Sequence, residues 1–273
     1  MTLIQTNPQT CKRDGNCSQV CPLNLIEYSQ GELPTAVADI DGLCIRCGHC
    51  VAVCTPGSLF HAEVRLYRCP PKQEELAISA EQAEQFLRSR RSIRNYRKKS
   101  VPLELLQKMI ETAGYAPSAH NTQGAEWLVL SDPVEMKPLV GLVGDWMRWM
   151  LDAMPIVAMS VHLDKALERL EAGDDVVLRE APVLILVHGR KDDRMASTTC
   201  TIALSHLELA AAGQGLGACW AGYFSAAASN YPPMVAALDL PDAHICYGAM
   251  MLGYPQYDYH RMPERKVPVI RWR

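Results

Sequence analysis

The chain has 273 residues, of which 48% are hydrophobic and 21% are charged. This is the composition of a soluble globular protein with room for one or two domains. The formal net charge of −3 at pH 7 is close to balance and argues against a nucleic-acid-binding protein. The first ten residues have no basic start and no apolar region, so we expect no secretory signal and a cytoplasmic location. The longest apolar stretch, 139–161, contains charged residues and a proline, which favours a buried or amphipathic helix over a membrane span.

Cysteine placement is the first specific signal. Of 11 cysteines, seven lie between positions 11 and 54. The second group has the CxxCxxCxxxC spacing of bacterial ferredoxins and consists of Cys44, Cys47, Cys50 and Cys54. Moving back 33 residues from each of these gives Cys11, Asp14, Cys17 and Cys21. The chain therefore contains an internal repeat in which an aspartate stands at the second cysteine position.

This repeat predicts two iron–sulfur clusters. In such runs three thiolates bind one cluster and the fourth binds the other cluster. We therefore expect one [4Fe–4S] cluster on Cys21, Cys44, Cys47 and Cys50. The second, either [4Fe–4S] or [3Fe–4S], would be bound by Cys11, Cys17 and Cys54. Asp14 is either its fourth ligand, through oxygen, or a solvated residue beside a three-iron cluster. A zinc site or disulfides are the alternatives, but zinc sites favour two separated CxxC pairs.

The other four cysteines lie outside both predicted ligand sets. Cys200, Cys219 and Cys246 lie in apolar segments and are expected in the core. Cys69 is interpreted as structural or incidental, because the ligand sets are complete without it.

A connector around 69–78, marked by two consecutive prolines, divides the sequence into an expected cluster domain, 1–70, and an α/β-patterned domain, 79–273. Ser79 and Gln82 form the pattern of a capping box that opens a helix. Pro102 opens another helix, which Gly114 can end. Further expected elements are strands at 126–131, 182–188 and 244–252, an apolar helix at 197–213, and a strand at 267–272 with no partner nearby in sequence.

Residues 88–99 hold seven basic residues and no acidic one. A solvated or nucleic-acid-binding surface is one interpretation of such a run. The other is a phosphate site, because the alternating side chains of Arg90, Ser92 and Arg94 can converge on one dianion.

Three segments together resemble the nitroreductase family. They are RRSIR at 90–94, APSAHNTQ at 116–123 followed by the strand EWLVL, and GLGACWAG at 215–222; the terminal RMP at 261–263 resembles the family's basic C-terminal motif. The resemblance covers about residues 79–273. With the two clusters, the whole chain is similar to the ferredoxin-fused branch of that family.

The resemblance implies an FMN site. Its phosphate and ribityl contacts would come from Arg90, Ser92 and Arg94, with Arg91 close by and Arg261 assisting. The partner subunit would contribute Pro117, Ser118, Ala119 and Asn121, with Gln123 near. The backbone of Trp220, Ala221 and Gly222 would face the flavin ring. One departure is Tyr259, which stands where many relatives have a lysine.

The resemblance also implies an α+β fold with a mainly antiparallel sheet flanked by helices, in a homodimer whose C-terminal extension joins the partner's sheet. Three functions stay open. The first is an enzyme that passes electrons from the clusters to FMN and then to an electrophile such as a nitroaromatic. The second is an enone or quinone reductase, and the third is a redox carrier or sensor for a protein partner. Ferredoxin or NAD(P)H is the expected donor, although no GxGxxG motif follows a strand.

Overall fold

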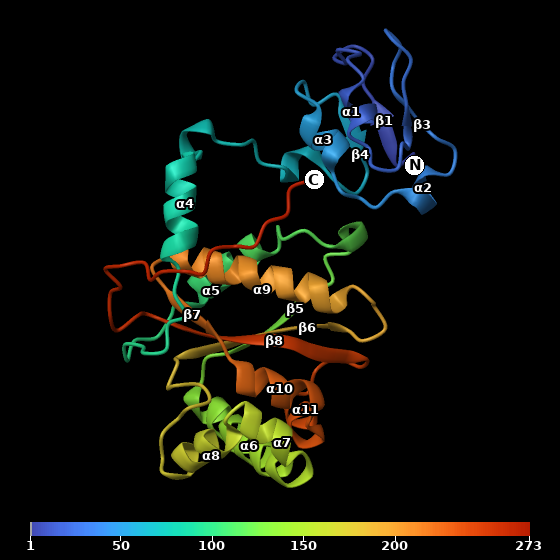
Figure 1. Cartoon of the computed structure of the whole chain (residues 1–273). Coiled ribbons are helices and arrows are strands. Elements are labelled where there is room, and N and C mark those ends of the chain that lie inside the picture. Colours follow the sequence, from blue (N-terminus) through green and yellow to red (C-terminus); the bar gives the residue numbers. More distant parts are fainter. Residues whose placement is uncertain (1) are drawn as a thin grey trace. The chain divides into compact units, whose positions relative to one another are not determined.

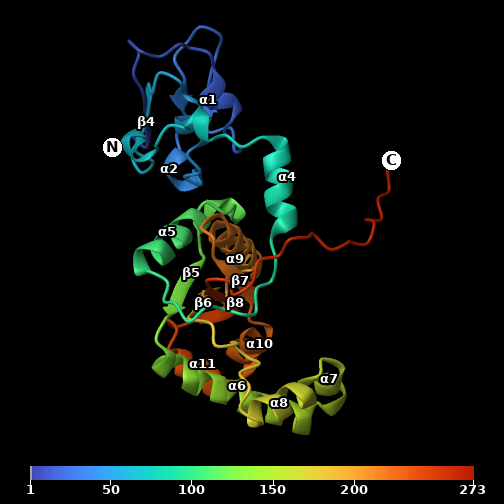
Figure 2. The same cartoon turned by 90° about the vertical axis from the view of Figure 1, so that its left-hand side faces the viewer.

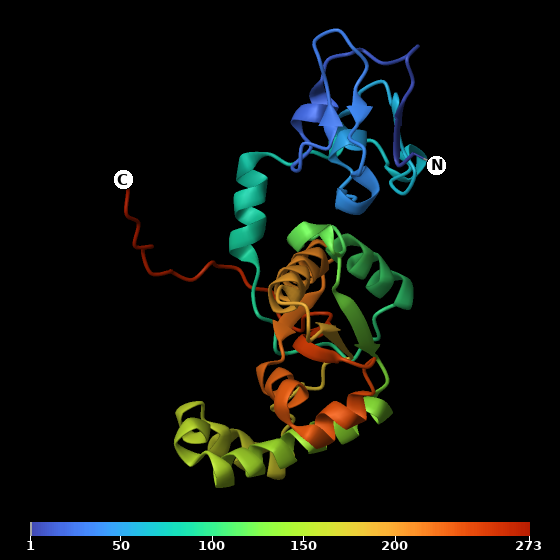
Figure 3. The same cartoon turned by 90° about the vertical axis from the view of Figure 1, so that its right-hand side faces the viewer.

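The structure is a computed structural model that describes residues 2–273 (Figures 1–3). The chain divides into two compact units. One contains the residues up to Ile78 together with His120–Thr122, and the other contains Ser79–Ala119 and Gln123–Arg273. None of the helices within 2–273 combines the length and hydropathy that a membrane crossing requires.

The first unit is built from very short elements. They are β1 (Ile4–Thr6), α1 (Asn16–Gln19), β2 (Ile26–Glu27), β3 (Thr35–Ala36), α2 (Ile40–Leu43), α3 (His49–Val53), β4 (Leu59–His61), and the 3₁₀ turns η1 (Leu66–Arg68) and η2 (Glu74–Leu76). Strand β1 pairs antiparallel with β4, and β2 with β3. Elements of two to five residues cannot bury much apolar surface, so bound groups or crosslinks are expected to hold such a unit together.

The 33-residue repeat is also a repeat of backbone conformation. Arg13 and Arg46 have φ values of 54° and 55°, and Gly15 and Gly48 have φ values of 72° and 74°. Each left-handed glycine directly precedes a short helix, α1 or α3. The two cysteine runs therefore fold as two copies of the same tight turn.

The second unit contains the sheet and the longer helices. Its elements are α4 (Ala80–Ser89), α5 (Leu103–Ala113), η3 (Ala119–Asn121, at the boundary of the two units), β5 (Glu126–Leu130), α6 (Pro133–Ala153), α7 (Pro155–Ser160), α8 (Leu163–Glu171), β6 (Val183–Arg190), α9 (Ala196–Gly213), β7 (Gly217–Trp220), α10 (Gly222–Asn230), α11 (Pro232–Leu238) and β8 (His244–Gly253). The four strands form one antiparallel sheet in the order β5-β6-β8-β7.

Helices cover both faces of this sheet. Helices α5 and α9 lie on one face, and α6, α10 and α11 lie on the other (Figures 1 and 3). Strand β6 is buried from Val183 to Gly189, so its alternating side chains enter both cores. The expected α+β fold, with an antiparallel sheet flanked by helices, is confirmed.

Several local expectations are also confirmed. Helix α4 begins with the capping box, in which Ser79 Oγ accepts from the Gln82 amide and the Gln82 side chain accepts from the Ser79 amide. Helix α5 runs to Ala113 and is capped by Gly114, and three of its apolar side chains are buried: Leu106, Met109 and Ala113. The thiols of Cys200, Cys219 and Cys246 are buried as expected.

Two expectations need correction. The apolar stretch 139–161 is not one helix, because α6 ends at Ala153 and α7 begins at Pro155. Proline has no amide hydrogen to continue the helical ladder and clashes with the preceding turn. The tail 267–272 has no regular secondary structure in this chain, and its side chains are exposed (Figure 2). Its pairing with a partner's sheet stays a prediction.

Gly217, at the start of β7, permits a close approach of the basic segment. The amide of Ile93 donates to Ala218 O at 2.9 Å, and a Cβ on Gly217 would lie about 2.5 Å from Ile93 Cγ1. We expect Gly217→Ala to lower the free energy of unfolding by roughly 1–3 kcal/mol through overpacking. The measurement is denaturant unfolding of the intact protein.

Gly213→Ala is the matched control, because a Cβ there meets nothing within 4 Å. That variant should match the wild type or exceed it by up to about 1 kcal/mol, since alanine is the better helix former. Equal stability of the two variants would show that the close approach at Ile93 does not constrain the segment.

Candidate functional site

The second cysteine run and one distant cysteine surround a common hollow. Cys21, Cys44, Cys47 and Cys50 all line it, together with apolar side chains that include Ile26 and Ile40. The lining of this hollow is almost entirely apolar. A dry pocket lined by four convergent sulfurs fits a thiolate-bound iron–sulfur cluster.

The first run surrounds a second hollow of similar size. Its lining includes Cys11, Asp14, Cys17 and Cys54. Asp14 is exposed, and its Oδ1 accepts a hydrogen bond from the Asn16 amide at 3.1 Å. One carboxylate oxygen is thus engaged by the turn, and the other is available to a ligand.

Backbone amides point at the sulfurs in the same way in both halves. The Arg13 amide donates to Cys11 Sγ and the Arg46 amide to Cys44 Sγ, each at 3.4 Å. The matching fourth cysteines accept from amides four residues later, at 3.3 Å for Cys21 and 3.2 Å for Cys54. Such donors stabilise the negative charge that sulfur ligands carry, so the turns are arranged for thiolates.

His61 breaks the symmetry between the halves. Its Nδ1 accepts from the amides of Glu63 and Val64, which places the proton on Nε2, 3.7 Å from Cys44 Sγ. The imidazole is only 1% exposed. Thirty-three residues earlier stands Tyr28, whose hydroxyl donates to Arg13 O instead. Sequence analysis missed His61. The one signal in the sequence is that this histidine ends an apolar segment at the position where the first copy of the repeat has Tyr28.

Burial sets the ionisation of two cysteines. Desolvation raises the pKa of Cys50 to about 11, and it also raises the pKa of Cys17. Burial thus favours the protonated thiols, and a metal bound by them would have to displace their protons.

In the second unit, the basic segment is fixed against β7. Ser92 forms a parallel bridge with Ala218, and Ile93 is buried. Arg90 and Arg91 line a hollow beside the turn at 215–217, whereas Arg94 is exposed. The segment is thus not a freely solvated run, and it presents two guanidinium groups to one concave surface.

The partner of Arg90 is Glu208 on α9. Arg90 Nη1 lies 2.7 Å from Glu208 Oε1, and the two side chains are 28% and 10% exposed. A buried carboxylate needs such a partner. The pair occupies one guanidinium nitrogen and leaves the other donors of the fork for an anion, so the hollow fits a phosphate. Sequence analysis missed Glu208.

The loop at 116–123 has an unusual backbone. His120, Asn121 and Gln123 all have positive φ, between 49° and 55°, and the Gln123 amide donates to Ser118 Oγ at 2.9 Å. Non-glycine residues in this region are strained and are concentrated at functional sites. Asn121 falls within the first unit, whereas Pro117, Ser118 and Ala119 fall within the second.

At the end of β7, Trp220 packs over Gly248 and is 36% exposed. The Ala221 amide is already engaged, because it donates to Ala249 O at 2.9 Å. Gly222 begins α10, where an amide has no acceptor within the helix. The Gly222 amide is therefore suited to an external acceptor.

The C-terminal segment contributes tyrosines to the Arg90 hollow. Tyr257, Asp258 and Tyr259 line it, and Arg261, which is exposed, is not among the lining residues. The structure thus places Tyr259, which stands where many relatives have a lysine, in the lining of the same hollow as Arg90 and Arg91.

Comparison with known proteins agrees with this geometry. Residues 87–254 match the model of the nitroreductase family. The chain belongs to the nitroreductase family. Residues 3–55 match a 4Fe-4S dicluster domain, so the chain is an oxidoreductase with an N-terminal iron–sulfur domain. The predicted resemblance to ferredoxin-fused nitroreductases is confirmed.

Curated relatives and solved structures share part of this chain. A Thermus thermophilus protein named NADH dehydrogenase is 31% identical over 67% of this chain and 92% of its own length. An NADH dehydrogenase/NAD(P)H nitroreductase of Methanothermobacter thermautotrophicus, named as putative, is 27% identical over 62% and 75%. A Bacteroides fragilis nitroreductase solved with bound FMN has a TM-score of 0.54 at 22% identity, covering 68% of this chain and 95% of its own. The Desulfitobacterium hafniense nitroreductase with bound FMN has a TM-score of 0.55 at 20% identity, covering 71% and 100%.

The contribution of the Arg90–Glu208 pair to stability can be measured with a double-mutant cycle. We expect Arg90→Met to lower the free energy of unfolding by about 2–4 kcal/mol, because it leaves the Glu208 carboxylate buried without a partner. Arg90→Met/Glu208→Leu should recover most of that loss, because both charges are removed. Urea unfolding of the wild type, both single variants and the double variant provides the measurement. Additive losses in this cycle would contradict a coupled pair.

Proposed function

We propose that this protein is an FMN-dependent oxidoreductase that passes electrons from two iron–sulfur clusters to FMN and then to an electrophilic small molecule such as a nitroaromatic. The observation that carries the proposal is the presence, on one chain, of two register-matched cysteine hollows and a basic hollow within a nitroreductase fold. Bound FMN would supply the link between single-electron donors and two-electron hydride chemistry.

The cysteine hollows define the proposed metal ligands. Cys21, Cys44, Cys47 and Cys50 would bind one [4Fe–4S] cluster. The other cluster, [4Fe–4S] or [3Fe–4S], would be bound by Cys11, Cys17 and Cys54, with Asp14 as its fourth ligand. The amide donors to the sulfurs and the lining of each hollow support this division.

The proposed flavin-binding residues would contact different parts of FMN. Arg90 and Arg91 would hold the phosphate, Ser92 and Arg94 would extend this contact along β7, and Arg261 would assist from the tail. Trp220, Ala221 and Gly222 would face the ring, with the Gly222 amide available to donate to flavin N5. Pro117, Ser118, Ala119, Asn121 and Gln123 would approach from a partner subunit in a homodimer. Exposed apolar side chains on the tail, among them Val267, Val269 and Trp272, favour such a partner.

Two other functions compete with nitro reduction. An enone or quinone reductase would use the same flavin site, and a carrier or sensor would reduce a partner protein. The names of the two curated relatives favour NAD(P)H as a donor, whereas the dicluster domain favours reduced ferredoxin.

Replacement of Asp14 by cysteine tests whether the two clusters differ in their ligands. We expect Asp14→Cys to change the EPR spectrum of the anaerobically purified protein to that of two all-cysteine [4Fe–4S] clusters, because thiolate holds iron more firmly than carboxylate. Glu32→Cys adds a thiol at an exposed acidic residue outside the hollow and should leave the spectrum unchanged. An identical spectrum for Asp14→Cys and wild type would remove Asp14 from the ligand set.

The order of electron transfer can be followed optically. In anaerobic titrations, we expect reduced ferredoxin to bleach the cluster absorbance and then the flavin absorbance. Addition of a nitroaromatic, an enone or a quinone should then restore the flavin signal, and the fastest acceptor identifies the reductase class. Reduction of the flavin by NAD(P)H with the clusters left oxidised would contradict the proposed electron path from the clusters to FMN. Reoxidation by a protein partner alone would favour the carrier.

A further inference from the structure

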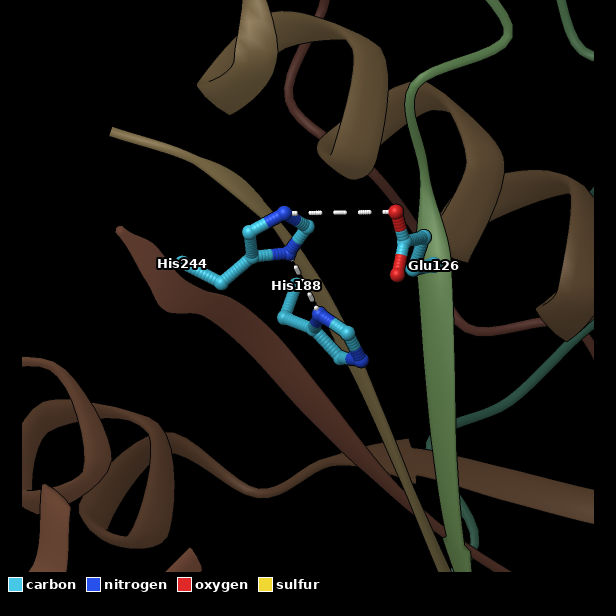
Figure 4. Close-up of side chains that lie close together, drawn as sticks. All are labelled: Glu126, His188 and His244. Carbon is cyan, nitrogen blue, oxygen red and sulfur yellow. Dashed lines mark hydrogen bonds and ion pairs between the residues drawn. The ribbon is translucent and has the colours of Figure 1, made fainter. Parts of the chain in front are cut away.

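Three side chains of a kind that can bind metal meet at one end of the sheet, apart from the proposed phosphate and ring contacts. They are Glu126 at the start of β5, His188 near the end of β6 and His244 at the start of β8 (Figure 4). One ligand atom from each lies within 4.8 Å of the others. We propose that these three residues form a binding site for a divalent transition-metal ion, with Zn²⁺ as the representative.

A β-bulge brings the two histidines together. Strand β6 pairs with β8 so that Val187 is opposite Gly248 but His188 is opposite Cys246, which leaves Tyr247 as the extra residue. Without this shift His188 would oppose Tyr247 and face away from His244, because side chains alternate along a strand. Bulges re-aim side chains in this way and are common next to functional sites.

The imidazoles are spaced for a shared ion. His188 Nδ1 and His244 Nδ1 are 3.0 Å apart. Two nitrogens bound to one tetrahedral zinc at about 2.0–2.1 Å would be about 3.3 Å apart, close to this spacing. The ion would replace the proton that the two Nδ1 atoms share, and the rings would turn so that both lone pairs face it. Both rings are well buried: His188 is 5% exposed and the His244 side chain 8%.

Glu126 supplies the third ligand and the negative charge. Its Oε1 lies 3.9 Å from His244 Nε2, beyond hydrogen-bond distance, and Figure 4 shows the carboxylate directed toward this ring. Because an imidazole offers one ion a single nitrogen, Glu126 would complete the set by moving to the Nδ1 side of His244, where His188 lies. The side chain is 56% exposed, so it is free to swing onto an ion. Two imidazoles and one carboxylate are a common ligand set for zinc, whereas Mg²⁺ prefers oxygen ligands alone.

The site lies apart from the proposed ring contact at Trp220, although Glu126 follows Gln123 by three residues. Gly189 faces α9, since a Cβ there would meet Ala196 and Cys200, and His188 therefore faces the opposite side of the sheet. Along β8, His244 is six residues, or roughly 20 Å, from Met250, the partner of Trp220. The role proposed for the ion is therefore to crosslink β5, β6 and β8 and to stabilise the fold.

Zinc binding can be measured on the full chain with its clusters in place. Tag-free, anaerobically purified protein is dialysed against buffered Zn²⁺, and zinc and iron per chain are determined by elemental analysis. We expect one zinc per wild-type chain, an unchanged iron content, and a melting temperature that rises with Zn²⁺ but not with Mg²⁺. Zinc X-ray absorption should show nitrogen and oxygen neighbours at about 2.0–2.1 Å, not sulfur at about 2.3 Å.

Variants assign the ligands. His188→Gln and His244→Gln should abolish stoichiometric zinc, and Glu126→Gln should weaken its affinity at least tenfold. Glu126→Gln changes an exposed side chain, so the test stands even if a buried histidine variant fails to fold. His206→Gln, on α9, is the matched histidine control and should bind zinc as the wild type does. Sulfur neighbours, no zinc in the wild type, or unchanged affinity in Glu126→Gln would each overturn the proposal.

Discussion

The second unit depends on the antiparallel pairing of β6 with a neighbour on each side. Because β5 and β8 satisfy its backbone on both edges, β6 can be buried on both faces. One face receives α9, which carries Glu208 to Arg90, and the other receives α10 and α11. The position of the basic segment against β7 follows, since β7 is held in place by β8. A shift of one residue in the register of a strand in this sheet would move its side chains from one core to the other.

The local features of this fold could be read from the sequence because each is encoded within a few residues. The capping box at Ser79 and the glycine that ends α5 are examples, and so is the 33-residue register of the cysteines. The roles of the cofactor-binding residues came from resemblance, not from spacing, and they are still proposals. Residue spacing alone does not distinguish a solvated basic run from a phosphate site.

What the sequence did not reveal depends on contacts between distant segments. Glu208 lies 118 residues from Arg90, and its burial is decided by how α9 packs. Likewise, His188 and His244 meet only because of strand order and a bulge. His61 looked like an ordinary strand residue, since its importance comes from the position of Cys44 Sγ. The break at Met154 was visible as Pro155, but the length of the apolar stretch suggested continuity.

The exchange of the fourth cysteines has a consequence for how the first unit is made. Cys21 lines the hollow of the later run, and Cys54 lines the hollow of the earlier one. During synthesis the chain leaves the ribosome with its N-terminus first. Cys11 and Cys17 therefore emerge well before Cys54, which completes the cysteines of their hollow. Neither hollow has all of its cysteines until residue 50 or 54 has emerged. For the proposed clusters, the two halves of the repeat would therefore be a single unit of maturation.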